Sequence, residues 1–189
     1  MQKKNLFTRV KAYLTPQYSK TVFMAYTSVF IALFIILSYF NISLTPIIEI
    51  RLGYFALAVA GLVGGPVMGF FTGALGDLLK MLIVPGTGSF FPGFTLCYAF
   101  LGMCYGFLFY KRNITIFRAA LGAVCELLMS LFGITTCLSI LYHMPWTATF
   151  VSRIPKCAAM FFVSTILVFL VIRSLDAALT KAQLISHQR

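Results

Sequence analysis

The feature that most constrains this chain is segment 21–40, which holds twenty residues and no charge. A helix of that length crosses a hydrocarbon core about 30 Å thick. The rest of the chain agrees, because 60% of its 189 residues are hydrophobic, 10% are charged and the mean hydropathy is +0.95. A soluble domain of this size needs a largely polar surface. The sequence therefore predicts an integral membrane protein. Segment 21–40 is also too long for a cleaved signal peptide, and no small-residue cleavage site follows it.

Five further apolar runs follow the first one. They cover residues 51–63, 66–84, 95–110, 117–141 and 150–172, and the second is the shortest. Turn residues separate them, as at Gly64-Gly65-Pro66, where proline is placed to begin the next helix. The fold predicted is an all-α bundle of six transmembrane helices with outer loops that cap a ligand site. Its parts are an N-terminal arm (1–20), a membrane domain (21–174) and a C-terminal tail (175–189).

The positions of lysine and arginine predict the orientation. With six spans, the N-terminal arm, segment 111–118 and residues 173–189 lie on one side of the membrane, and they carry eleven of the fifteen basic residues. Because basic loops stay in the cytoplasm, we expect both termini there and a bacterial plasma-membrane location. Topology thus explains most of the net charge of +11, and no folded basic surface for nucleic acid is apparent.

The four remaining basic residues are expected near the outer ends of the spans. They are Arg51, Lys80, Arg153 and Lys156, and the acids on that side are Glu49 and Asp77. Charges at a membrane are costly unless they are paired, hydrated or used. The surplus of cations favours an anionic ligand. The alternative is that Asp77 pairs with Lys80, and that the others extend to the interface.

A rigid aromatic loop follows Lys80. Segment 85–95 holds three glycines, two prolines and three phenylalanines (Phe90, Phe91 and Phe94), and ends at Thr95. A stiff backbone edged with rings can cap a flat aromatic molecule. Trp146 is expected on the same side, as part of a lid. Alternatively, these rings form an interfacial aromatic belt.

Small residues recur at helical spacing in three of the predicted spans. Gly65, Gly69 and Gly73 form one ridge, Gly102 and Gly106 repeat the spacing in the fourth span, and Ser28 with Ala32 form a ridge in the first. Such ridges let helix backbones approach closely in lipid. They serve packing within the bundle or, where exposed, docking of another membrane subunit.

Residues suited to catalysis are few. The four acids lie on different elements, and neither a metal-ligand spacing, a nucleophile with its base, nor an ATP-binding motif is present. We therefore expect no enzyme, no metal and no cofactor. The five cysteines are interpreted as small apolar residues. Glu126, in the middle of a span, is interpreted as bonded to a neighbouring helix, with a functional role as the alternative.

Several motifs resemble a known family, from about Ser28 to Lys156. They are Arg51-Leu52-Gly53-Tyr54, the segment 60–66, Gly76-Asp77-Leu78-Leu79, the segment 90–95, the segment 105–110 and Arg153-Ile154-Pro155-Lys156. In order and spacing they are similar to the folate-family substrate-binding subunits, or S components, of energy-coupling factor (ECF) transporters. Phe91-Pro92-Gly93-Phe94-Thr95 is the most specific piece. In the first helix, Ser28 and Ala32 stand where the family has Ala-x-x-x-Ala.

The resemblance implies a vitamin-binding subunit that docks on a transmembrane coupling protein driven by two ATPases and reorients to release the vitamin inside. For folate, it implies that basic residues meet the glutamate tail, that aromatic residues stack on the pterin, and that Asp77 accepts its N–H groups. The residues concerned are Arg51, Lys80, Arg153 and Lys156 for the tail, and Phe90, Phe91, Phe94, Tyr98 and Trp146 for the ring, with Thr95 beside them.

Three alternatives stay open at this point. The first is an S component for riboflavin, pantothenate or thiamine, of which cationic thiamine suits the basic residues least. The second is a small membrane enzyme that acts on lipid head groups, and the third is an accessory membrane protein without a small ligand.

Overall fold

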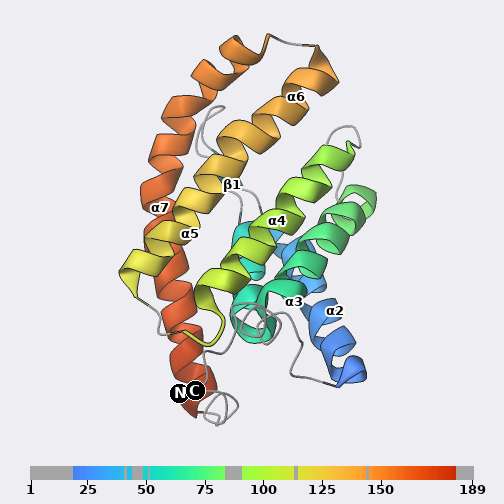
Figure 1. The fold of residues 1–189 in the computed structure, drawn as a ribbon, viewed down its shortest axis with the longest axis vertical. Helices are drawn as coiled ribbons and strands as arrows, with labels where there is room; N and C mark the ends of the chain where they lie inside the picture. Colours follow the sequence, from blue (N-terminus) through green and yellow to red (C-terminus); the bar gives the residue numbers. More distant parts are fainter. Residues whose placement is uncertain are drawn as a thin grey trace, which may run out of the picture.

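The computed structural model describes residues 19–40, 42–43, 49–50, 52–83, 91–112, 115–143 and 145–181. These residues form a helical bundle with one short antiparallel strand pair (Figure 1). In chain order the elements are α2 (Lys20–Tyr39), β1 (Ile42–Ser43), β2 (Glu49–Ile50), α3 (Gly53–Ile83), α4 (Pro92–Phe109), α5 (Ile116–Leu128), the π-helix η1 (Met129–Ile134), α6 (Thr135–Tyr142) and α7 (Trp146–Lys181).

Within the described residues, five helices are long and apolar enough to cross a membrane. They are Lys20–Tyr39, Gly53–Ile83, Pro92–Phe109, Ile116–Tyr142 and Cys157–Ser174. The predicted helical membrane protein is confirmed, although the structure has five such helices where six runs were expected. The difference lies in α3, which joins the second and third runs into one element.

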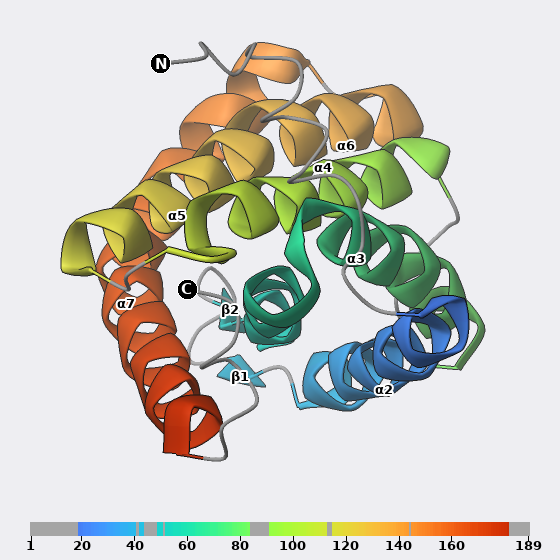
Figure 2. The same ribbon diagram turned by 60° about the horizontal axis from the view of Figure 1, so that its bottom comes forward.

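The two runs in α3 meet at a sharp bend. Gly65 has φ 77° and ψ −169°, which no helical residue adopts and which a side chain would strain. Pro66 then starts the second half, since its fixed φ suits the first turn of a helix. In Figure 2 the first half of α3 is seen nearly end-on in the centre, while the second half crosses the view. The turn predicted at Gly64-Gly65-Pro66 is therefore a bend between two helical directions.

The first half of α3 forms the centre of the bundle. Ala56, Leu57 and Ala58 are fully buried, and they belong to a core that includes Phe34 of α2 and Ile172 of α7. Large apolar side chains on the outside remain exposed, among them Leu82, Phe162 and Ile166. An apolar surface of this kind suits contact with lipid chains.

The second half of α3 packs against α4 with almost no side chains between the two backbones. A Cβ atom added to Gly69 would lie 2.1 Å from the carbonyl oxygen of Gly102, and one added to Gly73 would lie 2.2 Å from that of Tyr98. In the first half of α3, a Cβ atom added to Gly61 would lie 2.6 Å from the backbone nitrogen of Gly106. Only glycine permits such close approach. We call this interface, built on Gly61, Gly69, Gly73, Gly102 and Gly106, the glycine seam.

Candidate ligand-binding site

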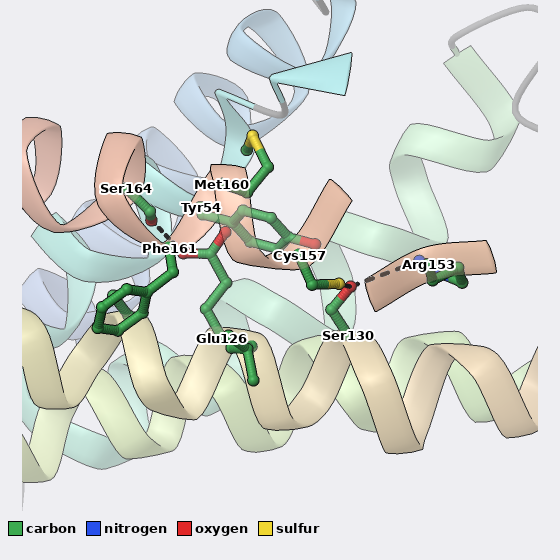
Figure 3. A pocket seen from close by; sticks show the side chains of 10 residues that line it. Tyr54, Glu126, Ser130, Arg153, Cys157, Met160, Phe161 and Ser164 are labelled. Carbon is green, nitrogen blue, oxygen red and sulfur yellow. Dashed lines mark hydrogen bonds between the residues drawn. The ribbon is translucent and has the colours of Figure 1, made fainter. Parts of the chain in front are cut away.

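A pocket near the predicted site lies between α5 with η1 on one side and α7 on the other, and Tyr54 of α3 also lines it (Figure 3). Its empty space is about 430 Å³, counting the part that opens outward. We call it the α5–α7 pocket. Its lining residues are Tyr54, Ala123, Glu126, Leu127, Ser130, Arg153, Cys157, Met160, Phe161 and Ser164.

Glu126 lies at one end of this pocket. Its side chain is buried, with 6% of its surface exposed, and its Oε2 accepts hydrogen bonds from the hydroxyl groups of Tyr105, at 3.2 Å, and Ser164. These donors come from α4 and α7, so the predicted bond to a neighbouring helix is confirmed twice over. The same carboxylate also lines the pocket, which leaves the alternative functional role in place.

Arg153 lies toward the other end. Its Nη2 donates to the hydroxyl oxygen of Ser130 at 3.4 Å, and the thiol of Cys157 approaches that oxygen at 3.6 Å. In Figure 3, Ser130 lies between Glu126 and Arg153. The pocket therefore has an acidic end and a basic end, and a hydroxyl group separates them.

The backbone that presents Ser130 is a π-helix. The carbonyl oxygen of Ser130 accepts a bond from Thr135 Oγ1 at 3.2 Å, across a turn wider than that of an α-helix. Single π-turns shift the register of a helix and are frequent at functional sites. Glu126 and Ser130 are four residues apart, so helical spacing already places them on one face, and the wide turn shifts the register of the residues that follow Ser130.

A second, smaller hollow of about 180 Å³ adjoins the α5–α7 pocket. Tyr54, Glu126 and Ser130 line both, and Tyr98 of α4 lines only the second. The rings of Tyr54 and Tyr98 stack, with centroids 5.8 Å apart and planes 29° apart. Two aromatic faces thus lie beside the acidic end of the pocket.

The predicted residues of α3 and α4 gather around Tyr98 but outside both linings. Thr95 Oγ1 donates to Asp77 Oδ2 at 2.9 Å, and Lys80 Nζ lies 5.6 Å from the centre of the Tyr98 ring. Asp77 is 3% exposed. The structure brings these four residues together and connects them to the pocket through the Tyr98 ring.

The predicted aromatic cap is found in two separate places. Phe91 and Phe94 contact edge to face at 5.9 Å at the start of α4. Trp146 stacks on Phe150 at 4.8 Å, and its Nε1 donates to Thr136 Oγ1 at 3.2 Å. None of these rings lines either hollow. Arg51 and Phe90 lie outside the described residues, as does the side chain of Lys156.

The small-residue ridge of α3 and the small-residue pair of α2 have different surroundings. Gly65 meets the ring of Tyr110, and Gly69 and Gly73 belong to the glycine seam, so packing inside the bundle accounts for all three. Ser28 and Ala32 lie exposed on α2, beside exposed Val29 and Ile36. A docking surface for another subunit is therefore retained only for Ser28 and Ala32.

Sequence reasoning missed most of the α7 side of the pocket. Cys157, Met160 and Ser164 carry no pattern that separates them from ordinary residues of a membrane helix. Tyr54 had a signal, since it belongs to the first of the family motifs, and Glu126 had one as an acid in the middle of a span. Within the described residues, no group of three or more His, Cys, Asp or Glu side chains is placed to hold a metal ion.

Comparison with known proteins gives three consistent results. The family model described as "ECF-type riboflavin transporter, S component" matches residues 19–177. The folate transporter FolT of Clostridium novyi (strain NT) is 36% identical over 148 residues, which are 77% of this chain and 85% of that protein. A crystal structure of FolT bound with folic acid has a TM-score of 0.72 at 26% identity, covering 83% of this chain and 95% of the other. This chain therefore belongs to the ECF-type S component family.

Proposed function

We propose that this chain is the S component that captures folate for an ECF-type importer. The observation that carries the proposal is the likeness to FolT over 77% of the chain, together with the fold shared with a folic acid-bound FolT. The family model is named for riboflavin, so the ligand must be argued separately.

The charges of the α5–α7 pocket support folate over riboflavin. Arg153 lines the pocket, and a guanidinium group is suited to binding a carboxylate. Folate ends in a glutamate with two carboxylates, whereas riboflavin carries none. The stacked Tyr54 and Tyr98 rings provide faces for a flat heterocycle.

A ligand of folate's size requires both hollows. Tyr54, Glu126 and Ser130 line the two spaces, so they lie at the boundary between them. A modest movement of these side chains joins the hollows into one site. The cap expected from segment 85–95 lies mostly outside the described residues, and Phe91 and Phe94 belong to the part of it that the structure describes.

The transport cycle follows from the family. In this proposal α3 contributes two spans, divided at Gly65, which gives six spans with both termini in the cytoplasm of a bacterial cell. The subunit has no catalytic activity of its own. It docks on a transmembrane coupling protein through the α2 face at Ser28 and Ala32, and two partner ATPases supply the energy for reorientation and release.

Titration of the purified, detergent-solubilised protein tests the function. We expect folic acid to bind one to one with a dissociation constant in the nanomolar to low-micromolar range, observed by calorimetry and by Trp146 fluorescence. Riboflavin and pantothenate are the matched comparison ligands. Tight binding of riboflavin with none of folic acid would replace the proposal by its nearest competitor.

A further inference from the structure

Glu126 is a buried acid whose carboxylate joins three helices. An acid in the middle of a membrane span costs more than a neutral side chain, and a glutamine accepts hydroxyl hydrogen bonds equally well. Tyr105 and Ser164 both donate to Oε2 of Glu126, which an amide oxygen at that position would also allow. These two bonds therefore do not by themselves require an acid at this position.

The place of Glu126 in the pocket suggests what the acid does. Glu126 lines both hollows, beside the ring of Tyr54, and Arg153 lines the pocket on the far side of Ser130. A carboxylate accepts hydrogen bonds and repels anions, while a guanidinium donates and attracts them. The pocket is thus able to distinguish the two ends of an elongated ligand by charge.

Folate has two ends that match this arrangement. Its pterin carries a 2-amino group next to a ring N–H, a pair of donors that a carboxylate oxygen is suited to accept. Its other end carries the glutamate carboxylates, which Glu126 repels. Placing the pterin at Glu126 also brings the flat ring to the two stacked tyrosines.

We propose that Glu126, the buried carboxylate that lines both hollows opposite Arg153, is the specificity-determining residue that accepts the paired donors of the pterin edge and so fixes the direction of the ligand. This inference rests on the proposed folate function. It moves the acceptor role expected of Asp77 to Glu126, because Asp77 lines neither hollow and holds Thr95 instead.

The test pairs one change in the protein with one change in the ligand. Binding of folic acid and of 2-desaminofolic acid, which lacks the 2-amino group, is measured by calorimetry for the wild type and for Glu126→Gln. Glutamine keeps the shape and the bond from Ser164 but replaces one carboxylate oxygen by a donor. We expect the wild type to bind folic acid at least about tenfold more tightly than the analogue, and the variant to prefer it less than about threefold.

The matched comparison is Asp77→Asn, the same change at the other buried acid. Its preference between the two ligands should equal that of the wild type. A Glu126→Gln variant that weakens both ligands equally, and so retains the preference, overturns the inference and leaves Glu126 as a structural bond between helices.

Two further outcomes separate the inference from the proposed function. Equal binding of the two ligands by the wild type overturns the inference without any variant, so the test survives a variant that fails to fold. A folded wild type that binds no folic acid overturns the proposed function, and the inference with it.

Discussion

The α3–α4 interface and the α5–α7 interface differ in how closely their helices approach. The first is the glycine seam, and the second contains the α5–α7 pocket. Across the seam, the backbones of Gly69 and Gly102 touch and leave no space for a ligand. Between α5 and α7, by contrast, polar side chains such as Glu126 and Arg153 line a pocket. The α3–α4 interface thus serves as a rigid support, while the α5–α7 pocket holds polar side chains with which a ligand can form hydrogen bonds.

The two interfaces should also respond differently to amino-acid substitutions. In the seam, any added atom meets backbone, which cannot move without separating two helices. In the lining of the α5–α7 pocket, a changed side chain alters the chemistry of the pocket while the helices keep their other contacts. Substitutions in the glycine seam should therefore mainly lower stability, and substitutions in the lining of the α5–α7 pocket should mainly lower ligand affinity.

The largest effect is expected from Gly69→Ala. Its Cβ would lie 2.1 Å from a carbonyl oxygen of α4, so the two helices must separate, at a cost near the upper end of about 1–3 kcal/mol. The matched control is Gly133→Ala, where the nearest atom, at 2.6 Å, is the side-chain sulfur of Cys97, which has room to rotate. The apparent melting temperature in detergent measures both. Equal losses for the two variants would contradict the claim that backbone contacts make the glycine seam less tolerant of an added methyl group than a glycine that faces a side chain.

The next effect in size is expected from Arg153→Ala. Removing the guanidinium group from the basic end of the pocket should weaken folic acid binding by more than about tenfold. Arg173→Ala is the control on the same helix, because Arg173 is exposed and lies over the Phe169 ring at 5.5 Å, away from the pocket. Calorimetry decides, and an unchanged affinity for Arg153→Ala would remove this residue from the site.

A smaller effect is expected from Lys80→Ala. Lys80 contacts the Tyr98 ring outside both linings, and a half-exposed cation–π contact contributes about 0.5–1 kcal/mol. The affinity for folic acid should fall less than about fivefold, as measured by the same titration. A loss as large as that of Arg153→Ala would show that Lys80 meets a carboxylate of the ligand directly.

The smallest effect is expected from Trp146→Phe. Phenylalanine keeps a ring against Phe150 and loses only the exposed bond to Thr136, so stability should fall by less than about 1 kcal/mol. Folic acid affinity, measured by calorimetry, should stay within about twofold. A tenfold loss of affinity would instead support a role for Trp146 in a lid over the ligand, one of the two roles that the sequence allows.

The sequence predicted the helices well because hydropathy and turn residues are local signals. The run 21–40 became Lys20–Tyr39, and the run 95–110 became Pro92–Phe109, which starts three residues earlier because Pro92 suits the first turn. The join in α3 was not predicted, since the backbone angles of Gly65 decide whether two runs count as one bent helix or two.

The site was less predictable because it depends on which helix faces meet. Arg153 was selected for its charge and lines the pocket, whereas Ser130 lines it about one helical turn after Glu126 and carries no residue pattern that marks it. Asp77, Lys80 and Thr95 were expected at the site but line neither hollow, whereas Tyr98 lines the second one. Charge and motif located the region, and helix register decided which side chains line it.

Protection of Cys157 by folic acid tests most directly that the α5–α7 pocket is the binding site. Cys157 lines this pocket, whereas Cys104 lines neither hollow and serves as the internal control. Maleimide labelling of each cysteine is followed over time by mass spectrometry, with and without saturating folic acid. The account predicts that folic acid slows labelling of Cys157 several-fold and leaves that of Cys104 unchanged. Unchanged labelling of Cys157 in protein that binds folic acid would contradict it.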